Sequence, residues 1–289
     1  MSHHSGCSAE QDSASEFADE EGGAAEGNSR FIVSAQDGPH RDLPGLLERH
    51  LAHPFRKPVL DYNRAALATA LAAWRAWNPA APLILDAGCG VGWSTLAIAA
   101  QYPDHFVLGV DQSLDRLQRG KPLPLPANAL LLRADLVDFW RLLAGEGIRL
   151  ARHYNLYPNP WPKIGHLARR WHGHAVFPVW RELGGVVECR SNWSIYIEEM
   201  ALALSRLSGQ PVAAEAYALP PGGQPMTPFE KKYLASGHGL WRCVVDFAAA
   251  PGQASVAVGA LAVAGVAGVS PDFSPGFLPM PASTVDKCQ

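Results

Sequence analysis

The sequence predicts an α/β fold with a seven-stranded, mostly parallel sheet that carries helices on both faces. Three observations support this prediction. Short apolar runs alternate with segments of helical periodicity, a glycine-rich turn follows the first of these runs, and the 289 residues suffice for one sizeable core. Strand–helix alternation of this kind is typical of parallel sheets whose two faces are both covered.

Each apolar run is interpreted as a strand, and the strands are expected at residues 83–87, 106–111, 129–132, 150–157, 185–190, 212–217 and 240–247. Helices are expected where apolar residues recur at helical spacing, at residues 62–77, 93–101, 114–119, 136–144, 166–183 and 196–207. The first helix is expected to stop at Asn78-Pro79, because proline does not continue a helix.

Charge divides the chain into three parts. Residues 1–29 hold seven acidic residues and no Lys or Arg, so residues 1–30 are predicted to form a disordered acidic leader. Residues 31–250 are predicted to form the folded domain, and the Ala/Val/Gly- and Pro-rich residues 251–289 a low-complexity C-terminal extension. The whole chain has a net charge of −3, but without residues 1–29 it has 20 acidic against 24 basic residues. This mildly basic body could bind RNA locally.

The cysteines give no pattern typical of a metal or redox site. Cys7, Cys89, Cys189, Cys243 and Cys288 lie far apart and include no C-x-x-C pair, so no metal is expected. A reduced, cytoplasmic protein fits best, since the N-terminus lacks the features of a signal peptide. No membrane segment is expected, because the most lipophilic stretch, 256–269, is shorter than the roughly 20 residues needed to span a bilayer. The oligomeric state stays open.

The glycine-rich turn points to a nucleotide-like cofactor. After the apolar run 83–85 come Asp86, Gly88, Gly90 and Gly92, an acid-x-G-x-G-x-G spacing. A dinucleotide fingerprint would need glycine at position 93, which is Trp93. The spacing instead resembles the first motif of Rossmann-like, class I S-adenosylmethionine-dependent methyltransferases. An NAD-binding domain and glycines that serve packing alone are the alternatives.

Two further acids follow the next two predicted strands. Asp111 ends the second strand, where a carboxylate can accept hydrogen bonds from both hydroxyls of a ribose. Asp135 comes just after the third strand, where members of the methyltransferase family often place an acid against the adenine amino group. Acids at three successive strand ends, counting Asp86, argue against a packing role alone.

A proline-rich segment and a basic cluster lie at the end of the fourth predicted strand. Prolines at positions 158, 160 and 162 exclude a regular helix and stiffen a loop that could present a reacting base. Trp161 could stack on a base or pack against the sheet. Lys163, Arg169, Arg170 and the nearby histidines form a cluster suited to phosphates. His166, His172 and His174 are interpreted as a solvated face rather than as metal ligands.

These motifs together resemble the tRNA (guanine-N7)-methyltransferases. Residues 157–163 and 166–170, Y-P-N-P-W-P-K and H-L-A-R-R, are similar to that family's F-P-D-P-W-x-K-x-R-H-x-K-R-R-like run. Two further pieces follow in the family's order, namely Gly184-Gly185 with residues 191–200, and Thr227-Pro228-Phe229-Glu230, which matches a T-x-F-E motif. The resemblance covers roughly residues 80–247.

The resemblance implies methyl transfer from S-adenosylmethionine to N7 of a guanine in tRNA, with guanine 46 of the variable loop as the expected position. Asp86, Asp111 and Asp135, with Gly88, Gly90 and Gly92, would then bind the cofactor. The residues implied at the substrate guanosine are Lys163, Asn192, Thr227, Pro228, Phe229 and Glu230. Asn159 would lie between cofactor and base as the catalytic position, and Arg169 and Arg170 would contact RNA.

Two departures leave alternatives open. The family has acids where this chain has Asn159 and Asn192. A same-fold methyltransferase with another RNA or a small-molecule substrate would explain them, as would a non-catalytic RNA-binding homologue. Asn159 could instead serve turn geometry. Glu230 could accept from the guanine Watson–Crick edge or complete a capping box with Thr227.

Overall fold

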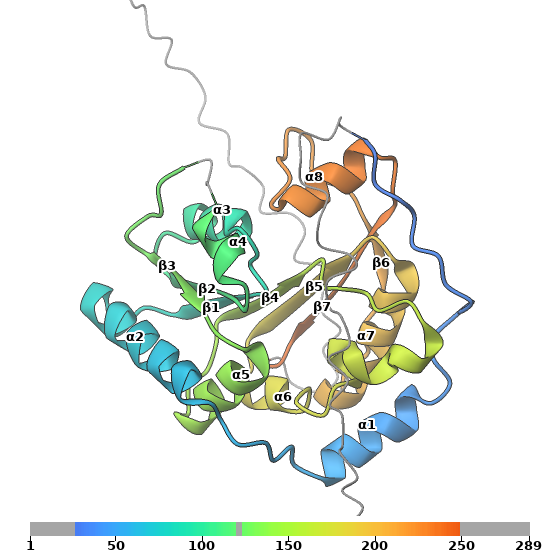
Figure 1. Cartoon of the computed structure of the whole chain (residues 1–289), viewed down its shortest axis with the longest axis horizontal. Coiled ribbons are helices and arrows are strands. Elements are labelled where there is room, and N and C mark those ends of the chain that lie inside the picture. The colour runs from blue at the N-terminus through green and yellow to red at the C-terminus, as the bar shows by residue number, and fades with distance from the viewer. Residues whose placement is uncertain (1–26, 120–122, 249–289) are drawn as a thin grey trace, which may run out of the picture. The chain divides into compact units, whose positions relative to one another are not determined.

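A computed structural model of the chain describes residues 27–119 and 123–248 (Figure 1). The predicted extension 251–289 lies outside the described residues, as does the predicted leader apart from residues 27–30.

All seven strands form one sheet. Their bounds are β1 (Leu83–Ala87), β2 (Phe106–Asp111), β3 (Ala129–Arg133), β4 (Arg152–Leu156), β5 (Val186–Ser191), β6 (Glu215–Tyr217) and β7 (Leu240–Asp246). The strand order is β3-β2-β1-β4-β5-β7-β6, and β7 runs antiparallel to both of its neighbours. The prediction of a seven-stranded, mostly parallel sheet is confirmed. The run β3-β2-β1-β4-β5 is the Rossmann order, in which ligands bind at the carboxyl ends of the strands.

Helices cover both faces of the sheet. The α-helices are α1 (Leu43–Ala52), α2 (Asp61–Trp77), α3 (Trp93–Gln101), α4 (Leu114–Gln118), α5 (Leu136–Gly145), α6 (Val179–Leu183), α7 (Ser194–Ser208) and α8 (Pro228–Ala235). Two short 3-10 helices, η1 (Ile164–Arg169) and η2 (Trp171–Gly173), follow β4. Figure 1 shows α1, α2, α5, α6 and α7 on one face and α3 and α4 on the other.

The strands divide their side chains between two cores. Leu83 and Leu85 of β1 pack into the larger cluster with α1, α2, α5, α6 and α7. Ile84, between them, packs with Ile98 of α3 in the smaller cluster. This alternation follows from the two-residue period of a strand, and it explains why β1 is apolar at consecutive positions.

The prediction of a single helix over residues 166–183 is wrong. The chain forms η1 and η2 there, and α6 begins only at Val179. Pro178 lies at the N-cap of α6, because a proline inside a helix removes a backbone hydrogen bond. At Gly173 a side chain would come within 2.1 Å of the Leu167 carbonyl oxygen, so the chain turns tightly there.

Two helices were not predicted from the sequence. Both α1 and α8 carry a proline in their first turn, Pro44 and Pro228, where proline is compatible with a helix. Cys189 of β5 and Cys243 of β7 are register partners, and both are buried as free thiols. Within the described residues, no helix is both long and apolar enough to cross a membrane.

Candidate active site

The glycine turn after β1 has a backbone that only glycine adopts readily. Gly88, Gly90 and Gly92 have φ values of 80°, 56° and 85°. A Cβ atom added at Gly88 or Gly90 would meet nothing within 4 Å, so packing does not explain either glycine. The turn is open on the side where side chains would stand, and a ligand can approach its backbone closely.

Asp86 connects this turn to α3. Its Oδ2 accepts hydrogen bonds from Ser94 Oγ at 2.6 Å and from Thr95 Oγ1 at 2.7 Å. Burial raises the pKa of Asp86 to about 6; the hydroxyls of Ser94 and Thr95 oppose this rise, and the charge of Asp111 adds to it. Near neutral pH this buried carboxylate favours a cationic ligand group close by.

The other two predicted cofactor acids lie along the same edge of the sheet. Asp111, at the end of β2, accepts from the Gly90 backbone N–H at 2.9 Å and from that of Ser113 at 2.8 Å. Asp135, just beyond β3, caps α5 by accepting from Val137 N–H at 2.9 Å. Because β3, β2 and β1 are parallel neighbours, the three carboxylates form a row.

The open glycine turn and this row of acceptors fit S-adenosylmethionine, which combines ribose hydroxyls, an adenine amino group and positive charge. No group of three or more potential metal ligands occurs in the described part of the chain.

The loop after β4 is strained. Tyr157 and Trp161 have φ values of 51° and 46°, and among the described residues they are the only non-glycine residues with positive φ. Between them, Asn159 accepts a hydrogen bond from Trp161 N–H at 3.3 Å with its side-chain Oδ1. Asn159 is exposed, and this contact stabilises the turn. Non-glycine residues in this backbone region cluster at functional sites.

The RNA-binding role predicted for Arg170 does not fit its position. Its guanidinium is fully buried and bonds both Glu199 oxygens, at 2.7 and 2.6 Å, so no phosphate can reach it. His172 is also buried, with Nε2 2.8 Å from Glu199, which corrects its placement on a solvated face. Burial alone would raise the pKa of Glu199, but His172 and Arg170 outweigh it and lower that pKa to about 2.

Two other members of the basic cluster remain at the surface. Lys163 and Arg169 are exposed, and the Arg169 guanidinium lies 4.9 Å from the centre of the Trp161 ring. Positive charge therefore remains beside the proline-rich loop. Trp161 itself is half-buried and has an arginine on its face.

Glu230 forms only half of a capping box with Thr227, and its carboxylate has another role. The Thr227 hydroxyl accepts from Glu230 N–H at 2.9 Å, which starts α8. The Glu230 carboxylate is fully buried and accepts from Tyr157 Oη at 2.7 Å, Arg190 Nη1 at 2.9 Å and Met226 N–H at 2.6 Å. Direct contact with guanine, the alternative left open by the sequence, is not available to this buried group. Glu230 instead fixes Tyr157, the first residue of the strained loop.

Asn192 follows β5 and contacts His238. Nε2 of His238 lies 3.2 Å from the Ser29 carbonyl oxygen, which can only accept, so Nε2 carries the proton. Nδ1 is then an acceptor for the Asn192 amide, 3.1 Å away. Of the other predicted substrate residues, Pro228 is half-buried and Phe229 is 48% exposed.

Glu199, Gln36 and their pairing with Arg170 were not predicted from the sequence. One indication was available, because Glu199 interrupts an otherwise apolar face of α7 beside Tyr196 and Met200, and buried acids are rare without a partner. Gln36, which bonds both Glu199 and Arg170, gave no indication, since it lies 163 residues from Glu199 in the chain.

Comparison with known proteins gives consistent matches. A family model described as "Putative methyltransferase" matches residues 80–243. The tRNA (guanine-N(7)-)-methyltransferase of Paracidovorax citrulli is 35% identical over 197 residues, which cover 63% of this chain and 74% of the relative. That of Bordetella pertussis is 29% identical over 248 residues, covering 75% and 91%. Among solved structures, an antibiotic-related methyltransferase is 16% identical with a TM-score of 0.44, covering 66% of this chain and 96% of its own.

Proposed function

The chain belongs to the tRNA (guanine-N7)-methyltransferase family, and on this premise we propose that it transfers a methyl group from S-adenosylmethionine to N7 of a guanine in tRNA. We propose guanine 46 of the variable loop as the nucleotide and the cytoplasm as the location. The Rossmann-like fold and the row of strand-end acids agree with a class I methyltransferase.

One observation carries the proposal. β1 and β4 are parallel neighbours, so the glycine turn after β1 and the strained loop after β4 leave the same edge of the sheet. Asn155 of β4 donates to the carbonyl oxygen of Ala87, the last residue of β1, at 3.4 Å. A cofactor on the glycine turn and a base on the proline-rich loop would therefore lie beside each other.

Methyl transfer to guanine N7 needs no general base. S-adenosylmethionine supplies an electrophilic methyl on a sulfonium, and guanine N7 has a free lone pair, so no proton has to leave. The chain must hold N7 in line with the methyl carbon and the sulfur. A loop stiffened by three prolines and fixed through Tyr157 and Glu230 suits that task.

The two asparagines are compatible with this chemistry. Asn159 keeps the turn at Trp161, and Asn192 keeps the contact with His238. A side-chain carbonyl can still accept from the N1–H or N2–H₂ edge of guanine. An amide stabilises the cationic product less than a carboxylate would, so we expect slower turnover than with aspartate at these positions.

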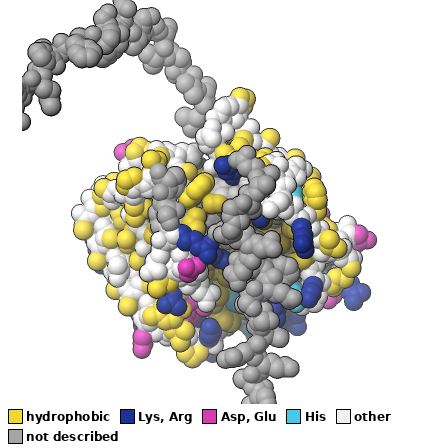
Figure 2. All heavy atoms as spheres, turned by 45° about the horizontal axis from the view of Figure 1, so that its top comes forward, with side chains coloured by type: hydrophobic (Ala, Val, Ile, Leu, Met, Phe, Trp, Pro, Cys, Tyr) yellow, Lys and Arg dark blue, Asp and Glu magenta, His cyan; other side chains and the backbone are white. Residues whose placement is uncertain are grey.

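Basic side chains would supply affinity for the RNA backbone. Lys163 and Arg169 are exposed at the proline-rich loop. Figure 2 shows Lys and Arg side chains recurring across the middle of one face of the molecule. Contacts of this kind make binding dependent on salt, and they do not select a sequence.

The test is methylation of tRNA by the purified protein. We expect incubation with labelled S-adenosylmethionine and unmodified tRNA to place the label in 7-methylguanosine on nucleoside analysis. A transcript in which guanine 46 is replaced by adenine should lose the label. Label in another nucleoside would assign a different RNA methyltransferase reaction, and tRNA binding without label would assign a non-catalytic homologue.

A further inference from the structure

An extended segment ahead of α1, residues 29–40, crosses the substrate side of the molecule. In Figure 1 it is the blue trace that runs from beside α8 toward α1. It contains neither helix nor strand, and it precedes the region matched by the family model. We call it the strap. Its conformation must come from the contacts it makes, because it has no regular hydrogen bonds of its own.

The first end of the strap is fixed to the segment between α8 and β7. Ser29 N–H donates to Ser236 Oγ at 3.0 Å, and the Ser29 carbonyl oxygen accepts from His238 Nε2 at 3.2 Å. His238 in turn accepts from Asn192. The strap is thus joined through one imidazole to a residue implied at the substrate guanosine.

Phe31 extends a run of stacked rings at this end. Its ring lies 4.2 Å from that of His238, with an interplanar angle of 6°. Behind His238 lies the ring of Tyr233, at 5.2 Å and 28°. Phe31 is nevertheless 66% exposed. One face of the phenyl ring is therefore held against an imidazole, while most of the side chain meets solvent.

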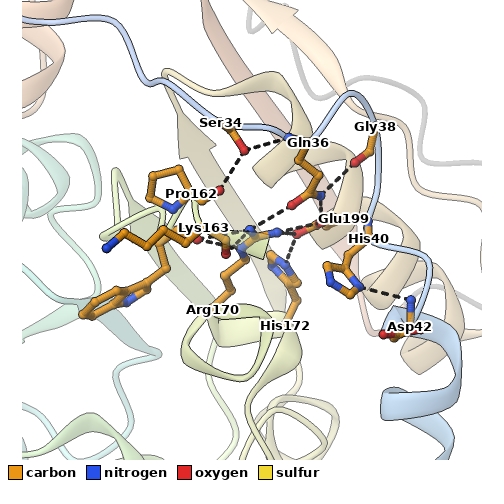
Figure 3. Close-up of polar contacts among 11 residues, drawn as sticks. Ser34, Gln36, Gly38, His40, Asp42, Pro162, Lys163, Arg170, His172 and Glu199 are labelled. Atoms are coloured by element: carbon orange, nitrogen blue, oxygen red, sulfur yellow. Dashed lines mark hydrogen bonds and ion pairs between the residues drawn. The ribbon is translucent and has the colours of Figure 1, made fainter. Parts of the chain in front are cut away.

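The second end is fixed to the proline-rich loop and to the buried ion pair (Figure 3). Ser34 Oγ donates to the Pro162 carbonyl oxygen at 2.7 Å. Gln36 donates to Glu199 through Nε2 and accepts from Arg170 Nη2 at 3.0 Å through Oε1. Arg170 also donates to the Trp161 carbonyl oxygen, at 3.2 and 3.1 Å. One guanidinium thus fixes the strained loop and the strap in a single arrangement.

We propose that the strap is part of the tRNA-binding site, with the exposed face of Phe31 stacking on an unpaired tRNA base and Gln36 positioning the strap. The inference rests on the proposed function and adds two residues to it. A ring held flat from behind loses little further freedom when a base stacks on it, and base–aromatic stacking is tolerant of sequence. The neighbouring Arg30 is exposed and can meet a phosphate.

The first test compares Phe31→Ala with Val33→Ala. Val33 is 88% exposed in the same strap and has no ring, so it is the matched control. We expect Phe31→Ala to raise the Kd for a fluorescently labelled, unmodified tRNA transcript by about 5- to 150-fold, the range of one lost stack. Val33→Ala and the rescue variant Phe31→Trp should bind like the wild type, and the Kd for S-adenosylmethionine should not change in any of them.

The second test is a double-mutant cycle with Gln36→Ala, which leaves Arg170 and Glu199 in place. If Gln36 acts by holding Phe31 in place, Gln36→Ala should also weaken tRNA binding. The double variant should then bind tRNA no more weakly than Phe31→Ala alone. Additive losses would overturn the positioning role of Gln36. Equal binding by Phe31→Ala and Val33→Ala would overturn the stacking role, as would faster methylation by Phe31→Ala, which would assign the strap as a cover. Because these assays measure binding, they remain decisive even if the wild type fails to produce 7-methylguanosine.

Discussion

The two halves of the candidate site are built in different ways. The cofactor half, over β1, β2 and β3, is held by contacts between residues close in the chain, such as Asp86 with Thr95 and Asp111 with Gly90, 9 and 21 residues apart. The substrate half, over β4 and β5, depends on contacts such as Tyr157 with Glu230 and Arg170 with Gln36, 73 and 134 residues apart. The contacts of the cofactor half thus join residues that are close in the sequence. The contacts of the substrate half join residues that only folding brings together.

The largest effect is expected from a substitution at Arg170, which disrupts the substrate half. We expect Arg170→Ala to lower the free energy of unfolding by about 3–5 kcal/mol, because it leaves the buried Glu199 carboxylate without its main partner. Denaturant titration measures this change. Arg169→Ala, one residue away but exposed, should stay within about 0.5 kcal/mol of the wild type. Equal losses in the two variants would contradict the structural role of the buried pair.

The next effect is a pH dependence of the cofactor half. Because burial raises the pKa of Asp86 from 3.8 to about 6, the folded protein holds this proton more tightly than the unfolded chain. The contribution of Asp86 to the free energy of unfolding is therefore complete below about pH 4. It is lost as the pH rises through 6, a loss of about 3 kcal/mol in the ligand-free protein.

The variant Asp86→Asn isolates this contribution, since an amide oxygen can accept from Ser94 and Thr95 without ionising. The difference in unfolding free energy between wild type and variant should change between pH 4 and pH 7 in favour of the variant. A difference that is flat over this window would show that Asp86 is not perturbed as described.

A smaller effect sharpens the assignment of the cofactor acids. Asp111→Ala should weaken binding of S-adenosylmethionine by about 100-fold, since it removes the proposed ribose acceptor and the bonds to Gly90 and Ser113. Calorimetry provides the Kd. The control is Asp115→Ala, an exposed acid that pairs with Arg119 in α4, for which we expect no change. Similar losses in both would argue for a general charge effect in place of a specific contact.

The smallest effect concerns Asn159. Asn159→Asp keeps an acceptor for Trp161 N–H and adds a negative charge near the proposed cationic product, so kcat with tRNA should rise by up to about 10-fold. Single-turnover kinetics with saturating cofactor would measure it. Asn159→Ala removes the turn contact and should lower kcat. A fall in kcat for the aspartate variant as well would mean that the site has adapted to the amide.

The same contrast explains what the sequence could predict. The strands, most helices and the glycine turn follow from local patterns, and so does the Thr227 hydroxyl that caps α8. Arg170 was misassigned because a cationic cluster in a sequence gives no information about a buried Glu199 that lies 29 residues away. The prediction that His172 lies on a solvated face was wrong for the same reason, because its partner is also Glu199. The strap offered no pattern at all, since its conformation comes from contacts with α7, with the segment between α8 and β7, and with the proline-rich loop.

We propose that the two halves form one site, so that a base on the loop after β4 faces a cofactor on the turn after β1. An experimental structure of the protein with S-adenosylhomocysteine and tRNA tests this most directly. We expect a flipped guanine between Asn159 and Asn192, with N7 directed at the sulfur of the cofactor product. A guanine bound elsewhere on the molecule, or a cofactor product away from Gly88 and Asp111, would contradict it.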